Sequence, residues 1–150
     1  MRFSSAHQLV TASVDGTVKC WDLSCPPDSG RGAALSAART LRGHRNSKNF
    51  VGLSVRDAPT GSWSRANPVL IACGSESGAA HIYSADCSST VAQWQLPCLQ
   101  TQDSVQTVPQ EEYISSVCWQ PEGSMSGACN PLLAVAASDG DLRLLALQNK

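Results

Sequence analysis

Aromatic residues are scarce in this sequence, and neither sign of charge is in excess. Of its 150 residues, 5% are aromatic and 15% are charged, and 11 Lys and Arg oppose 12 Asp and Glu for a net charge of −1. The charged fraction is below the roughly 25% of typical globular domains. Because no basic excess is present, the composition does not favour nucleic-acid binding. Burial must come from Val, Leu, Ile, Ala and a few Trp, which suits a β protein.

Long hydrophobic runs and paired cysteines are also missing. No stretch approaches the ~18 apolar residues of a membrane span, and the opening MRFSSAHQLV lacks the apolar core of a signal peptide. The seven cysteines include no Cys-x-x-Cys pair, and an odd number leaves at least one cysteine outside a complete disulfide framework. We therefore expect reduced thiols that act as small apolar side chains, in a protein of the nucleus and the cytoplasm that has no membrane partner.

Catalytic and metal-binding patterns are not found either. The two stretches nearest to a Gly-x-Ser-x-Gly nucleophile motif, 74–78 and 123–127, carry Glu76 and Met125 at the central position. The three histidines are far apart in sequence, and no Cys or His pair has the short spacing of a zinc site. We expect no enzyme, no metal and no cofactor.

What the sequence does contain is three similar hairpins. Apolar runs flank Asp15-Gly16, Glu76-Ser77-Gly78 and Asp139-Gly140, and such turn residues between apolar runs favour hairpins. The turn glycines are evenly spaced, at an interval longer than the ~40–45 residues of a WD repeat. The excess length falls in segments rich in Gly, Pro, Ser and Gln, which we expect to be disordered. The predicted units are about 1–42, 43–98 and 113–150, and the predicted loops are 24–38, 56–68 and 99–112.

The first hairpin, LVTASVDGTVKCWDL, has the residue pattern of a WD repeat. In a four-stranded propeller blade, a Ser, an Asp in the turn, a Trp and the His of a preceding Gly-His pair can share one hydrogen-bond network that fixes the turn. Gly43 and His44 form such a Gly-His pair, and the third unit repeats the Asp-Gly turn. The predicted network residues are Ser13, Asp15, Trp21, His44 and Asp139.

The later units carry weaker forms of this pattern. The second unit has Ser77 and Tyr83 at the Asp and Trp positions, and the third has Leu145 at the Trp position. These units must depend more on apolar packing, and His81, at an alternating strand position, is expected at the surface. We predict an all-β fold, a WD-repeat β-propeller fragment of about two and a half to three four-stranded blades that does not close into a ring.

A more specific match lies in four segments: GHRNSKNFVGLSV at 43–55, IACGSE at 71–76, ISSVCW at 114–119 and SDGDLRLL at 138–145. They resemble the C-terminal WD-repeat propeller of the constitutively photomorphogenic and suppressor-of-phytochrome-A family of ubiquitin-ligase components. The resemblance spans nearly the whole chain outside the loops. It implies that the remaining propeller blades, and a RING or kinase-like region, are missing from this sequence.

The resemblance also implies a function. The chain would be a non-catalytic recognition module, the substrate-binding or photoreceptor-binding part of a cullin-associated E3 ubiquitin ligase that acts in light signalling. Its partners would be transcription factors or photoreceptors with Val-Pro motifs, and other ubiquitin-ligase subunits. Phe50 matches an aromatic of the family's peptide pocket, and Ser47 replaces an acidic residue of the family. The peptide-binding residues implied are Asn46, Ser47, Lys48, Asn49 and Phe50.

Three alternatives stay open at this point. From the residues alone, Phe50 is better explained as a core residue of an inner strand. A generic WD scaffold, which assembles complexes without binding a Val-Pro peptide, would have the same repeats. So would a non-functional truncated chain.

Overall fold

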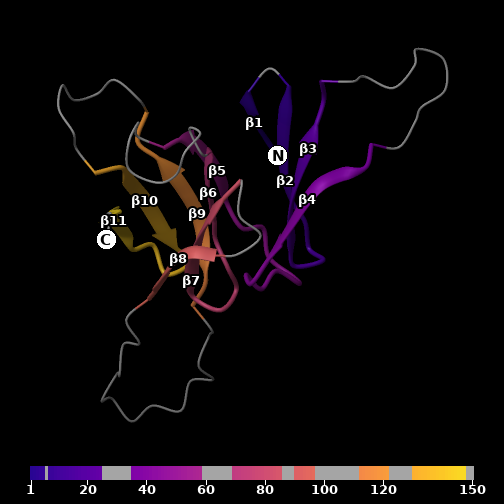
Figure 1. The fold of residues 1–150 in the computed structure, drawn as a ribbon. Coiled ribbons are helices and arrows are strands. Elements are labelled where there is room, and N and C mark those ends of the chain that lie inside the picture. The colour runs from indigo at the N-terminus through magenta and orange to yellow at the C-terminus, as the bar shows by residue number, and fades with distance from the viewer. Residues whose placement is uncertain are drawn as a thin grey trace, which may run out of the picture.

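The computed structural model describes residues 1–5, 7–24, 35–58, 69–85, 90–96, 112–121 and 130–147. All the regular structure among these residues is β, in three antiparallel sheets that follow one another along the chain (Figure 1). No helix able to cross a membrane occurs in the described ranges. The predicted all-β fold, a propeller fragment of two and a half to three blades that does not close into a ring, is therefore confirmed.

Each sheet lies within one of the three predicted units. The first has the order β1 (Arg2–Ser5), β2 (Gln8–Ala12), β3 (Thr17–Asp22) and β4 (Ala37–Arg42). The second has the order β5 (Leu53–Asp57), β6 (Val69–Cys73), β7 (Ala79–Ser84) and β8 (Thr90–Gln95). The third has three described strands, β9 (Ile114–Trp119), β10 (Leu132–Ala137) and β11 (Leu142–Ala146), with β10 in the middle.

The tight turns of the three hairpins are built alike. Gly16, Gly78 and Gly140 have φ angles of 71°, 72° and 98°, which an L side chain rarely adopts. Each donates its N–H over 3.2 Å to a carbonyl three residues earlier, on Ser13, Ser75 and Ala137 respectively. The even spacing of these glycines in the sequence thus corresponds to one repeated backbone shape.

Two predicted loops began or ended in the wrong place. β4 begins at Ala37 and β5 continues to Asp57, so both strands extend into the ranges assigned to loops. Arg56 reads as a polar loop residue, but its backbone pairs with Leu70 in the β5–β6 ladder, and its side chain reaches Gln120 of the next sheet. Most of the remaining predicted loop residues, 25–34, 59–68 and 99–111, lie outside the described residues.

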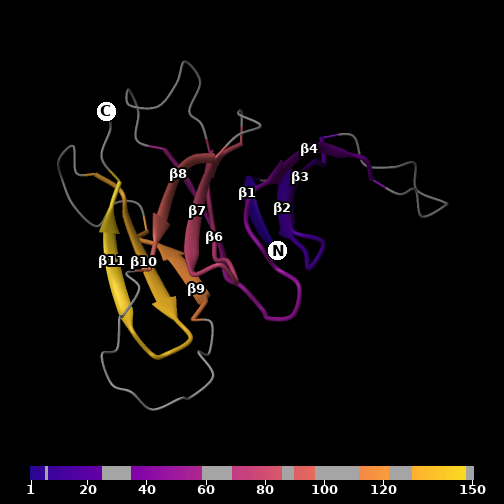
Figure 2. The same ribbon diagram turned by 90° about the horizontal axis from the view of Figure 1, so that it is seen from below.

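The second sheet lies between the other two, and both of its faces are covered (Figure 2). Adjacent residues of β6 point to opposite faces, so Leu70 packs toward the third sheet and Ile71 toward the first. The second and third sheets also approach closely at Gly74, where an added Cβ would lie 2.4 Å from the carbonyl oxygen of Ile114. Every residue of β7 is buried.

Three cysteines fall in the described residues, and all three are free thiols. Cys20 and Cys73 are buried in the core between the first and second sheets, and burial raises the pKa of Cys73 to about 12. Both act as small apolar side chains, as predicted. Cys118 is exposed.

Candidate peptide-binding site

The carboxylate of Asp15 stabilises its own turn. Its Oδ1 accepts hydrogen bonds from the backbone N–H of Thr17 at 2.9 Å and from the Thr17 hydroxyl at 2.6 Å. These bonds, the hydroxyl's first, lower the pKa of Asp15. The Ser13 hydroxyl accepts a long bond, 3.4 Å, from the backbone N–H of Asp15, and its contact with the Asp15 carboxylate is the smallest of the effects that lower the pKa of Asp15.

Trp21 is joined to a different partner from the one the sequence predicted. Its indole Nε1 donates over 2.9 Å to the hydroxyl of Thr11 on β2. Thr11 faces Lys19 across the ladder, and Leu9, two residues before it, faces Trp21. The side chains of Thr11 and Trp21 therefore share one face of the sheet, whereas Ser13 lies in the turn. Among the described residues, no hydrogen bond joins Trp21 to Ser13 or Asp15, so the predicted chain through all three residues is not continuous.

His44 makes its contacts in the second sheet, where Tyr83 stands at the Trp position. The Tyr83 hydroxyl accepts from the backbone N–H of His44 at 3.2 Å and lies 3.3 Å from its Nδ1. The rings of Tyr83 and His81 are stacked, with centroids 6.1 Å apart. We name His44, His81 and Tyr83 the aromatic cluster. It preserves a His-to-aromatic contact although the Trp and the Asp are both replaced.

The expectation of a surface position for His81 was wrong, since its exposed fraction is 4%. Burial, and secondly the nearby His44, lower the pKa of His81 to about 4. Burial also lowers the pKa of His44, although the Asp15 charge opposes the shift. Burial raises the pKa of Tyr83 to about 12. Both ring nitrogens of His81 and the Nε2 of His44 are buried without a hydrogen-bond partner in the described part of the chain.

Asp139 serves its own turn in the third sheet. Its Oδ1 accepts from the backbone N–H of Asp141 at 2.9 Å, and the residue is exposed. Asp141 in turn pairs with Arg143 at 2.8 Å. Within the described residues, Asp139 bonds to no histidine or tryptophan, and Leu145 occupies the Trp position of this sheet.

The predicted peptide-binding residues form the segment between β4 and β5, which we name the recognition loop (residues 45–50). Phe50 has an exposed fraction of 96%, so the alternative that placed it in the core is wrong. Ser47 and Lys48 are also exposed, and Asn49 is half-buried. Asn46 is buried, and its side-chain Nδ2 donates to the carbonyl oxygen of Ser13 at 3.3 Å. That bond ties the recognition loop to the first turn.

Glu76 contacts most of the recognition loop, and sequence reasoning did not predict this role, although Glu76 ends the matching segment at 71–76. Its Oε2 accepts from the backbone N–H and the hydroxyl of Ser47, at 2.9 and 2.7 Å. Its Oε1 accepts from the backbone N–H groups of Lys48 and Asn49, both at 2.6 Å. These bonds, the Ser47 hydroxyl's first, lower the pKa of Glu76 to about 2. Beside a turn glycine, Glu76 reads only as a polar turn residue.

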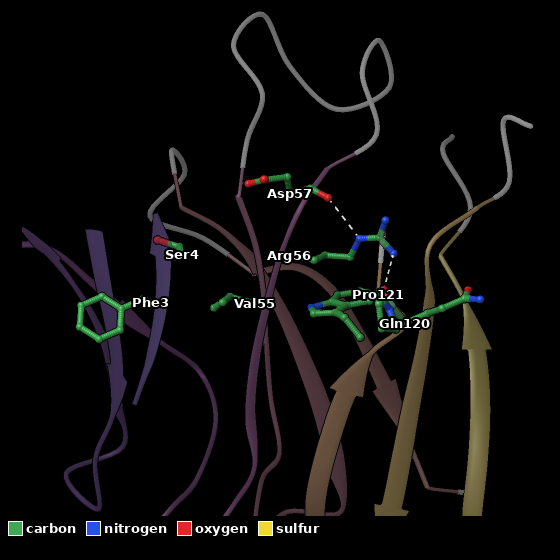
Figure 3. Close-up of a pocket in the computed structure, with 8 residues that line it drawn as sticks. Phe3, Ser4, Val55, Arg56, Asp57, Gln120 and Pro121 are labelled. Atoms are coloured by element: carbon green, nitrogen blue, oxygen red, sulfur yellow. Dashed lines mark hydrogen bonds between the residues drawn. The ribbon is translucent and has the colours of Figure 1, made fainter. Parts of the chain in front are cut away.

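A hollow of about 250 Å³ opens at the end of the inner strands opposite to the recognition loop and is drawn in Figure 3. The guanidinium of Arg56 crosses from β5 to the third sheet, where Nη1 donates to the carbonyl oxygen of Gln120 at 3.2 Å, and it lies 6.0 Å from the ring centroid of Trp119. Figure 3 shows the Asp57 carboxylate turned away from this guanidinium. Arg56 thus links two sheets. The hollow is lined by Phe3, Ser4, Val55, Arg56, Asp57, Trp119, Gln120 and Pro121.

The described ranges contain no group of three His, Cys, Asp or Glu side chains that could hold a metal ion. The recognition loop instead offers an exposed aromatic ring on a backbone held by a carboxylate. Such an arrangement can bind another polypeptide.

Comparison with known proteins identifies the repeats. The family "WD domain, G-beta repeat" matches residues 1–22. Protein SPA1-RELATED 3 of Arabidopsis thaliana is 30% identical over 145 residues, which are 97% of this chain and 15% of that protein. The E3 ubiquitin-protein ligase COP1 of Pisum sativum is 30% identical over 147 residues, which are 98% of this chain and 18% of that protein. The chain is a WD-repeat relative of the COP1 and SPA proteins.

A third similar protein is also named for its WD repeats. WD repeat-containing protein RUP1 of Arabidopsis thaliana is 42% identical over 82 residues, which are 55% of this chain and 17% of that protein. The aligned part is thus less than a fifth of each of these three relatives. The resemblance expected from the segments at 43–55 and 71–76 is confirmed for the WD-repeat region.

Proposed function

We propose that this WD-repeat chain is a non-catalytic protein-recognition module, the substrate-binding or photoreceptor-binding part of a cullin-associated E3 ubiquitin ligase that acts in light signalling. Its partners are proteins with Val-Pro motifs and other ubiquitin-ligase subunits, met in the nucleus and also in the cytoplasm. The similarity to COP1 and the SPA proteins over nearly the whole chain supports this proposal.

One observation carries the proposal, the exposure of Phe50. An aromatic ring that is 96% exposed would ordinarily be withdrawn from water, and here it stands on a loop whose backbone is fixed by hydrogen bonds to Glu76. Aromatic side chains on ordered backbone are typical anchors of protein interfaces, because they bury a large area at a small cost in conformational entropy. A Val-Pro pair is a suitable partner for such a ring, since both of its side chains are apolar and proline limits the freedom of the peptide.

The test is the affinity of the full-length protein for a fluorescent Val-Pro peptide, measured with and without Phe50→Ala. We expect the substitution to weaken binding at least about tenfold, because interface anchors contribute ~2 kcal/mol or more. Phe3→Ala is the matched control: Phe3 is 67% exposed but lies in the hollow at the opposite end of the inner strands. Equal affinity of the wild-type protein and Phe50→Ala would refute the role of Phe50.

The second candidate function is a WD scaffold that does not bind Val-Pro peptides. It is favoured by the 42% identity with RUP1, a relative whose name records WD repeats and no ligase. This candidate predicts no peptide binding by the wild-type protein, together with partners that are held through the sides of the sheets.

A further inference from the structure

The Glu76 carboxylate occupies a nest of backbone N–H groups. Three consecutive residues, Ser47, Lys48 and Asn49, direct their backbone N–H groups to its two oxygens at 2.6–2.9 Å. Consecutive N–H groups that converge in this manner form an anion-binding concavity. Here the anion belongs to the protein itself, and it comes from the β6–β7 turn, 27–29 residues further along the chain.

Apart from the Glu76 side chain, the contacts that hold the recognition loop lie at its start, at Arg45 and Asn46. Residues 43–52 belong to no strand. At the start of the loop, the backbone N–H of Arg45 donates to the Ser75 hydroxyl at 2.9 Å, and the carbonyl oxygen of Arg45 accepts from the backbone N–H of Glu76 at 2.8 Å. Beyond Asn46, the hydrogen bonds between the loop and other described residues go to the Glu76 side chain. Phe50 cannot hold itself in place, because its ring is exposed.

The β6–β7 turn does not itself need this carboxylate. It is closed by the bond from the Gly78 N–H to the Ser75 carbonyl oxygen and by the contact of 2.8 Å between the Ser75 and Ser77 hydroxyls. The side chain of Glu76 bonds only to atoms of the recognition loop among the described residues. Loss of its charge should therefore release the loop and leave the sheet intact.

We propose that Glu76 is a positioning residue, whose ionised carboxylate holds residues 47–49 in the one backbone conformation that presents Phe50 to a ligand. The effect of Glu76 on peptide affinity rests on the proposed function, whereas the effect of Glu76 on the loop conformation does not. A ligand that finds the loop already ordered avoids the entropy cost of ordering it, so the Glu76 charge strengthens binding without touching the ligand.

The test is amide hydrogen exchange in the full-length protein at pH 7. In the wild-type protein the amides of Ser47, Lys48 and Asn49 should exchange slowly, although Ser47 and Lys48 are exposed. In Glu76→Gln these three amides should exchange at least about tenfold faster, since a hydrogen bond to a charged group is lost. The amides of β6 and β7 should keep their rates. Glu112→Gln is the matched control, because Glu112 is an acidic residue whose backbone carbonyl oxygen lies beside Gly78 of the same turn.

Rapid exchange of the three amides in the wild-type protein would overturn the proposal, and this measurement needs no variant. Faster exchange throughout β6 and β7 in Glu76→Gln would also overturn it, because Glu76 would then stabilise the whole sheet. A selective effect on the loop supports the proposal even if no Val-Pro peptide binds the wild-type protein, in which case the proposed function alone fails. Where the peptide binds, Glu76→Gln should weaken its affinity about tenfold as well.

Discussion

The first sheet has the stronger WD pattern, but the second sheet is the more deeply buried of the two. The first carries the Asp-Gly turn, the Trp-Asp pair and the residues that match the WD family, yet its turn is exposed and β3 is only partly buried. The second has lost both the Asp and the Trp, yet every residue of β7 is buried. Position accounts for the difference, since the second sheet has a neighbour on each face and burial in stacked repeats comes from neighbours.

The burial of polar groups in the two sheets also depends on the number of neighbouring sheets. In the first sheet, Asp15 bonds within its own turn and Trp21 bonds to Thr11 across one strand pair, and both bonds are only partly buried. In the second sheet, the aromatic cluster is enclosed, and three of its ring nitrogens have no partner among the described residues. A polar group in the second sheet therefore costs more free energy when it becomes charged than one in the first sheet.

The largest expected difference is in apolar packing. Ile71→Ala in the second sheet should lower the free energy of unfolding by about 2–5 kcal/mol, because the Ile71 side chain is fully buried and its truncation leaves a cavity. Leu144→Ala in the third sheet should change it by no more than about 0.5 kcal/mol, because Leu144 is 69% exposed. Urea unfolding followed by tryptophan fluorescence measures both values. Equal losses would show that the open face of the third sheet is as well covered as the second sheet.

The sequence predicted the parts of the fold that depend on local chemistry. The three Asp-Gly or Ser-Gly turns are recognisable because a positive φ needs glycine, and the apolar runs around them fix the strands. The edges of the loops were missed where a strand ends in charged residues, as β5 does at Arg56 and Asp57. There the ladder, and the reach of Arg56 to the next sheet, outweigh local polarity.

The candidate site was less predictable, for two physical reasons. Glu76 bonds mainly to backbone N–H groups, which every residue except proline has, so no side-chain spacing in the sequence reveals the pair. His81 was placed at the surface because alternation along a strand assumes one solvated face, and the central sheet has none. The family resemblance predicted that Phe50 is available to a ligand, whereas the local apolar pattern predicted that Phe50 lies in the core.

The second prediction concerns acid. The pKa of His81 is about 4 in the folded protein, below the ordinary 6.5, so the unfolded chain binds more protons between these two values. The contribution of neutral His81 to the free energy of unfolding is therefore complete above pH 6.5. It is lost as the pH is lowered toward 4, and the loss reaches roughly 3 kcal/mol. Thermal unfolding at several pH values between 7 and 4 measures the loss.

A variant assigns this loss to the second sheet. His81→Phe keeps a ring beside Tyr83 and removes the titrating group, so its stability should depend less on pH over the same interval. His7→Gln is the matched control in the first sheet, because His7 is exposed. An unchanged pH dependence in His81→Phe would show that the charge taken up in acid is elsewhere, with His44, Asp15 and Glu76 the nearest groups to examine.

The smallest expected effect separates two residues of the first sheet. Thr11→Val removes the acceptor of the Trp21 Nε1 bond at 2.9 Å and should cost about 1 kcal/mol in the free energy of unfolding. Ser13→Ala removes the long bond from the Asp15 N–H and the weak contact of the Ser13 hydroxyl with the Asp15 carboxylate. It leaves the carbonyl oxygen that accepts from Asn46, so its cost should stay below about 0.5 kcal/mol. Urea unfolding of the two variants gives the order. If Ser13→Ala were the more damaging, the network predicted through Ser13, Asp15 and Trp21 would form in solution, and the first sheet would be fixed by its WD residues after all.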